Sequence, residues 1–104
     1  MPDKSPSPEA CQTMAEVRAG IDALDAEIVE LLALRFGYMR AAARIKPERG
    51  AVRDEARKAE VIANARAVAE ELNAPAGLIA ELWERLVEGS IAYEFDEWDR
   101  IRED

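Results

Sequence analysis

A few charged and polar side chains stand at helix positions where the surrounding pattern calls for apolar residues. Arg35 interrupts an apolar stripe, and Lys46, eleven residues later, falls within roughly 20° of it because each helical residue turns ~100°. Arg57, Ser90 and Glu94 interrupt two further stripes. Cations on a buried face are costly unless an opposite charge meets them. Their excess over inward carboxylates predicts a small dicarboxylate ligand, which guanidinium groups bind bidentately.

Arg18 precedes Arg35 on the same predicted helix but cannot easily serve the same site. It lies seventeen residues earlier, which places it about 100° away around the helix and roughly 25 Å away along the axis. A partner helix that runs antiparallel would bring Arg18 to the other cations. We therefore expect Arg18 to come from a second copy of the chain.

A long first helix must carry Arg18, Arg35 and Lys46. Thr13 and Glu16 form a capping box, which predicts a helix start at about residue 14. Apolar residues then recur at spacings of three and four until Pro47. A helix over 14–46 would be roughly 50 Å long at ~1.5 Å per residue, whereas a globular domain of this size is about 30–35 Å across. Its apolar face therefore requires a second copy.

Two further helices follow the loop at 47–53. Asp54 is a candidate N-cap for a shorter second helix. The stretch LNAPAG at 72–77 predicts a tight connection to a third helix, over about 75–101. The sequence thus predicts an all-α fold with three helices, long, short and long, in an intertwined homodimer. We expect a flexible N-terminal tail at 1–12 before a single domain at 13–104.

Composition excludes several classes of function. The chain has 104 residues and a net charge of -8, which argues against nucleic acid as a partner because phosphate contacts need a basic surface. No stretch approaches eighteen apolar residues and the first residues lack a signal-peptide pattern, so we expect a cytoplasmic protein without a membrane partner. Cys11 is the single cysteine and there is no histidine, which argues against a metal site and Cys/His catalysis.

Four stretches together resemble the all-helical class of chorismate mutases, which includes isochorismate pyruvate lyase relatives. The resemblance covers Cys11 to Trp98 and is carried by VRAGIDALDAEIVELLALR (17–35), AARIK (42–46), VRDEARK (52–58) and LWERLVEGSIAYE (82–94). It implies the chorismate mutase type II fold, an intertwined dimer, no cofactor, and one arginine in each site from the other subunit. The implied activity is an isomerase reaction, the pericyclic (Claisen) rearrangement of chorismate to prephenate in aromatic amino-acid biosynthesis.

The resemblance also implies roles for the cations. Arg18 of the partner subunit and Arg35 would bind the two substrate carboxylates. Lys46 would contact the ether oxygen, where negative charge develops, and Arg57 would add positive potential. Such a site works by orientation and fixed charge, without a nucleophile or a proton relay.

The remaining site residues include two departures from the family pattern. Asp54 matches a residue near the ring hydroxyl, and Ser90 matches one that helps to position a carboxylate. Glu94 stands where many members have a glutamine that donates to the ether oxygen, and a glutamate donates only when it is protonated. Lys58 stands where some mutases have a glutamate for the ring hydroxyl, which leaves the identity of the substrate open.

Three alternatives remain at this point. The same cations would suit an isochorismate pyruvate lyase, which yields salicylate and pyruvate in siderophore pathways. A mutase for a 4-amino analogue of chorismate is disfavoured, because Lys58 would repel an ammonium group near the ring. A non-catalytic helical dimerisation module would fit the spacing of the first helix, but it predicts an apolar residue at the position of Arg35.

We predict that each active site is shared between two chains. Arg18→Ala and Arg35→Ala chains should each be nearly inactive, and they should regain up to one functional site per heterodimer when they are refolded together. The measurement is turnover of the mixture against that of each parent. A mixture that contains heterodimers and stays as inactive as its parents would contradict the shared site.

Overall fold

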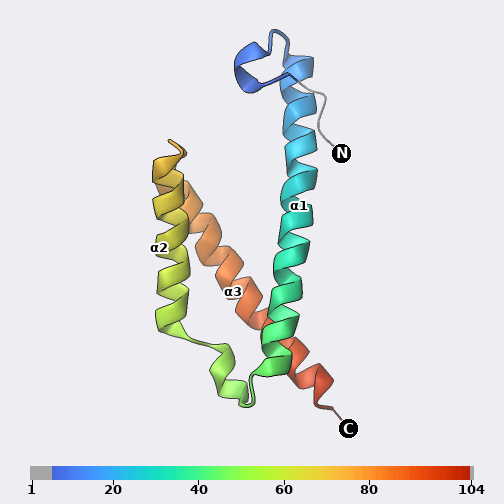
Figure 1. Cartoon of the computed structure of the whole chain (residues 1–104), viewed down its shortest axis with the longest axis vertical. Helices are drawn as coiled ribbons and strands as arrows, with labels where there is room; N and C mark the ends of the chain where they lie inside the picture. The colour runs from blue at the N-terminus through green and yellow to red at the C-terminus, as the bar shows by residue number, and fades with distance from the viewer. Residues whose placement is uncertain (1–5, 104) are drawn as a thin grey trace. The chain divides into compact units, whose positions relative to one another are not determined.

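The computed structural model describes residues 6–103, which are helical for most of their length (Figure 1). The elements along the chain are η1 (Pro8–Ala10), α1 (Met14–Ile45), η2 (Arg49–Val52), α2 (Glu55–Glu71) and α3 (Ala76–Ile101). No strand occurs within residues 6–103. With 32, 17 and 26 residues in the three α-helices, the predicted all-α, long-short-long fold is confirmed.

The capping box predicted at the start of α1 is present. The Glu16 carboxylate accepts hydrogen bonds from the backbone N–H groups of Gln12 and Thr13, at 2.9 and 3.1 Å, and the Thr13 hydroxyl accepts one from the Glu16 N–H at 3.1 Å. The bond from Gln12 contributes most to lowering the pKa of Glu16. The short η1 turn lies within the segment expected to be a tail, and the boundary between tail and domain stays a prediction.

Local signals also set the ends of α2. Asp54 is the N-cap, and its side chain accepts a hydrogen bond from the Arg57 N–H at 3.0 Å. At the other end Asn73 adopts a left-handed backbone, with φ of 56°. The N–H of Ala74 bonds to the carbonyl of Ala69 at 2.8 Å, which is the pattern of a Schellman cap. This cap turns the chain within a few residues, so α3 packs beside α2 in the opposite direction (Figure 1).

The chain divides into two compact units, with the boundary between Phe36 and Gly37 inside α1. The core of the C-terminal unit consists of the buried side chains of Val52, Val87 and Ile91. Partly buried apolar residues of α2 and α3 pack against them: Val61, Ile62, Trp83, Phe95 and Trp98. The core therefore joins α2 and α3 to the loop that follows α1.

The N-terminal unit leaves the apolar stripe of α1 uncovered in the single chain. Exposed large side chains recur along it with helical spacing: Ile21, Leu24, Ile28 and Leu31, the last 66% exposed. A stripe of this kind normally packs against another element. Within the described residues, no helix combines the length and the apolar content that a membrane span needs.

Glu88 on α3 binds cations of two other segments, Arg53 directly after η2 and Lys58 on α2. Its carboxylate binds the Arg53 guanidinium through two hydrogen bonds, at 2.9 and 3.2 Å, and the Lys58 ammonium through a third, at 2.7 Å. Arg53 first and Lys58 second hold the pKa of Glu88 down to about 2. This carboxylate thus fixes the end of the loop that begins at Pro47.

We predict that Glu88→Gln lowers thermal stability near neutral pH and that the loss shrinks in acid. Because the pKa of Glu88 is about 2 in the folded chain and 4.5 ordinarily, its stabilisation is fully present above about pH 4.5 and is lost as the pH falls toward about 2. Melting curves of wild type and variant from about pH 3 to pH 7, at low salt to limit screening, measure the difference.

The matched control for this comparison is Glu81→Gln, a change at an exposed glutamate on the same helix. Its melting temperature should stay close to that of the wild type throughout. Equal melting temperatures of Glu88→Gln and wild type at pH 7 would remove Glu88 from the attachment of the loop.

Candidate active site

The site centres on an ion pair between Lys46 and Glu94. Lys46 directly follows the last residue of α1, and Glu94 lies on the inward face of α3, one turn after Ser90. The Lys46 Nζ is 2.7 Å from Glu94 Oε2, and Glu94 is only 4% exposed. The structure therefore brings these two candidate residues together, and their roles toward a substrate stay predictions.

The carboxylate of this ion pair is almost fully buried, and the lysine side chain is partly buried. Two charges removed from water need good geometry to offset their desolvation, and the short Nζ–Oε2 distance supplies it. Glu94 acts here as an acceptor and occupies one of the three N–H donors of Lys46. The Lys46 side chain is 30% exposed. The remaining N–H groups of its ammonium can therefore donate to an oxygen of an anionic ligand.

The backbone at Lys46 is held by α3 as well. The Trp98 indole N–H donates to the Lys46 carbonyl at 3.0 Å, and the Arg102 guanidinium donates to the same oxygen at 2.9 Å. Neither contact was expected from the sequence. Two features of the sequence could have indicated them. Positions 94, 98 and 102 are four residues apart, which aligns them along one side of α3 and its C-cap. Pro47 lacks an N–H, so the end of α1 needs another donor.

Ser90, Asp54 and Arg57 lie in the same unit and have partners of their own. Ser90 is 3% exposed, and its hydroxyl donates to the Leu86 carbonyl at 2.7 Å. Asp54 caps α2 through the Arg57 N–H. The Arg57 guanidinium, expected on the inward face, is 63% exposed in the single chain and pairs with Glu60 on its own helix. The roles of these three residues in binding stay predictions.

Lys58, the second departure from the family pattern, is turned toward α3. Its ammonium lies 2.9 Å from Glu84 and 2.7 Å from Glu88. The hydrogen bond that Lys58 donates to Glu88 contributes most to raising the pKa of Lys58. Lys58 therefore carries a full charge that two carboxylates offset, which weakens the argument that it would repel an ammonium group on a substrate.

Arg18 and Arg35 belong to the N-terminal unit. Arg18 is exposed and Arg35 is half-buried, both on α1. Their meeting with Lys46 and Glu94 in one site remains a prediction.

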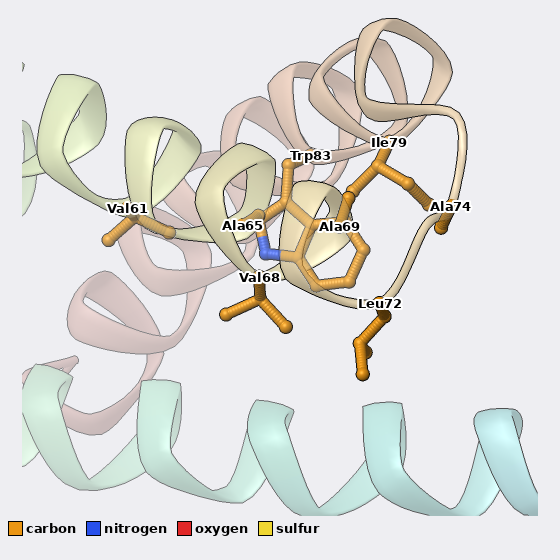
Figure 2. Close-up of a pocket in the computed structure, with 8 residues that line it drawn as sticks. All are labelled: Val61, Ala65, Val68, Ala69, Leu72, Ala74, Ile79 and Trp83. Carbon is orange, nitrogen blue, oxygen red and sulfur yellow. The ribbon is translucent and has the colours of Figure 1, made fainter.

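A separate apolar pocket of about 330 Å³ lies where α2 turns into α3. Figure 2 shows the Trp83 side chain among its lining residues, which are otherwise aliphatic: Val61, Ala65, Val68, Ala69, Leu72, Ala74 and Ile79. No charged side chain is among them. The pocket suits an apolar side chain and not a dicarboxylate, so the candidate site is the Lys46–Glu94 pair.

Comparison with known proteins fits this arrangement of helices and charges. Residues 17–95 match the family model described as chorismate mutase type II. The chain belongs to this family. It is also 30% identical over 96 residues to an isochorismate pyruvate lyase of Pseudomonas aeruginosa, an alignment that covers 92% of this chain and 95% of the relative.

Membership of the chorismate mutase type II family confirms the resemblance inferred from four short stretches of sequence and accounts for the three-helix fold. The matched range contains every candidate site residue from Arg18 to Glu94. It ends before Trp98 and Arg102, the two residues that hold the Lys46 carbonyl.

We predict that the Lys46–Glu94 pair is energetically coupled. Lys46→Ala should destabilise the protein by about 1–3 kcal/mol, because it leaves a buried carboxylate without its donor. Adding Glu94→Gln should recover part of that loss, since the neutral amide is cheaper to bury. Urea unfolding of the single and double variants measures the coupling.

Arg66→Ala, which changes an exposed cation on α2, serves as the control for removal of a positive charge. A double variant less stable than Lys46→Ala alone would show that Glu94 does not depend on Lys46.

Proposed function

We propose that the protein is a chorismate mutase that rearranges chorismate to prephenate. The observation that carries the proposal is the ion pair between Lys46, directly after α1, and the buried Glu94 on the inward face of α3, in a chain of the chorismate mutase type II family. The reaction breaks the ether C–O bond and forms a C–C bond within one molecule. It therefore needs a site that folds the substrate and stabilises charge, and it needs no nucleophile.

Lys46 would act on the ether oxygen. Negative charge grows there as the C–O bond breaks, and a fixed ammonium stabilises it more in the transition state than in the ground state. Glu94 accepts a hydrogen bond from the Lys46 ammonium and so holds the end of that side chain. Arg35 would bind one substrate carboxylate, which helps to hold the enolpyruvyl chain over the ring.

The complete site would include Arg18 of the partner subunit, in an intertwined homodimer. Two observations support a second copy. The apolar stripe of α1 is exposed in the single chain, and the pocket at the turn from α2 to α3 offers an apolar lining without charge (Figure 2). Covering both with another copy would bury apolar surface, which favours association.

Isochorismate pyruvate lyase is the second candidate, favoured by the 30% identity to a protein of that name. Elimination from isochorismate would move a ring hydrogen to the enolpyruvyl methylene carbon while the C–O bond breaks, leaving salicylate and pyruvate. The charge that develops on the oxygen is the same, so Lys46 would have the same role. The two candidates differ in how the ring is held, and not in the cation that catalyses the reaction.

We predict turnover of at least one of the two substrates and a strong dependence on Lys46. Loss of chorismate absorption reports the mutase reaction, and salicylate fluorescence reports the lyase reaction. Lys46→Ala should lower turnover at least about a hundredfold, the scale for loss of one preorganised donor, while Arg66→Ala should not. If the folded wild type converts neither substrate, both candidate functions fail.

We predict that replacing the Glu94 carboxylate by an amide raises the rate. A carboxylate only accepts hydrogen bonds, whereas an amide also donates. An amide also carries no negative charge to oppose the charge that develops on the ether oxygen. Glu94→Gln should therefore raise turnover at neutral pH, and initial rates of wild type and variant under the same conditions measure the effect.

Glu81→Gln is again the control and should keep the wild-type rate. Equal turnover of Glu94→Gln and wild type at neutral pH would contradict this effect of the Glu94 carboxylate.

A further inference from the structure

The C-terminus of α1 lacks a donor that an uninterrupted helix would have. The carbonyl of Ala43 would normally accept a hydrogen bond from the N–H four residues later, but that residue is Pro47, which has none. The Lys46 carbonyl lies just beyond the helix end. Both oxygens therefore need donors from elsewhere in the chain.

Trp98 on α3 and Arg102, the C-cap residue directly after α3, supply those donors. One guanidinium nitrogen of Arg102 donates to the Ala43 carbonyl at 3.1 Å, and the other donates to the Lys46 carbonyl at 2.9 Å. The Trp98 indole N–H donates to the same Lys46 oxygen at 3.0 Å. The guanidinium also stacks on the indole, with its central carbon 4.0 Å from the ring centroid. A cation at this end of a helix is further favoured by the helix dipole.

Glu94, Trp98 and Arg102 together hold Lys46 at both of its ends. The three residues are four positions apart, the first two on one face of α3 and the third at its C-cap. Glu94 binds the ammonium, and the other two bind the backbone carbonyl. A lysine side chain has a flexible four-carbon stem, so fixing the backbone as well as the Nζ narrows the positions that the charge can adopt.

We propose that Trp98 and Arg102 are positioning residues for the Lys46 ammonium. The inference rests on the proposed function, in which Lys46 acts on the oxygen that leaves the ring. Charge stabilisation depends steeply on placement, since an error of ~1 Å can cost about a hundredfold in rate. Neither residue contacts Nζ itself, so each acts through the backbone position of Lys46.

Kinetics of four variants test this proposal. Arg102→Ala and Trp98→Phe should each lower kcat by about ten- to a hundredfold, with a smaller change in KM, because Lys46 acts mainly in the transition state. Trp98→Phe keeps the apolar ring and removes the indole N–H. Arg102→Lys keeps a cation and should recover part of the rate. Arg100→Ala is the matched control, because Arg100 is exposed and pairs with Glu97 on its own helix.

Side-chain NMR provides a readout that is independent of activity. The chain has three lysines, Lys4, Lys46 and Lys58, so the ammonium signals of a lysine-labelled sample can be assigned by substitution. In Arg102→Ala and Trp98→Phe the Lys46 signal should move and broaden, while that of Lys58 should not. Arg100→Ala should leave both unchanged.

The outcomes separate the two proposals. An active wild type whose Arg102→Ala and Trp98→Phe variants match Arg100→Ala in kcat and in the Lys46 signal would overturn the positioning role. A folded wild type that converts neither chorismate nor isochorismate would overturn the proposed function, and the Lys46 signal alone would then decide whether α3 positions this lysine. If Arg102→Ala does not fold, Trp98→Phe and Arg102→Lys carry the same test.

Discussion

The termination of α1 before Pro47 is the constraint on which the C-terminal unit depends. Proline removes the N–H that would bond to Ala43, so the helix end needs outside donors. They come from the last turn of α3 and the residue after it, Trp98 and Arg102. This attachment places Lys46 where a helix end meets a loop, beside Glu94.

Lys46, Arg49, Arg53, Arg57 and Lys58 lie close together in a chain whose net charge is -8. Outside α1, most of these cations bind carboxylates of α3: Arg49 binds Asp99, Arg53 binds Glu88, and Lys58 binds Glu84 and Glu88. These pairs are partly exposed, and such pairs individually contribute little to stability. Together they fix the course of the loop. Lys46 differs because its carboxylate partner is almost fully buried.

Features set by near neighbours in sequence could be predicted, and those set by distant segments could not. The capping box of Thr13 and Glu16, the N-cap at Asp54 and the stop at Pro47 each involve a few consecutive residues, and each is where it was expected. Helical periodicity also gave the inward direction of Glu94. The contact of Arg102 with Ala43 spans 59 residues, and no local pattern specifies which carbonyl a distant guanidinium will find.

The pairing of Lys46 with Glu94 before any ligand is bound has a consequence for catalysis under the proposed function. A buried carboxylate offsets part of the positive potential that the developing oxyanion would feel, so glutamate at position 94 weakens the site electrostatically relative to an amide. The ion pair also holds the Lys46 ammonium in place. The entropy that this side chain would lose on binding substrate is therefore smaller. Trp98 and Arg102 hold the Lys46 backbone without adding negative charge. With an amide at position 94, Trp98 and Arg102 would still hold the Lys46 backbone. The negative charge that opposes the developing oxyanion would then be absent, while the contacts that fix this backbone would remain.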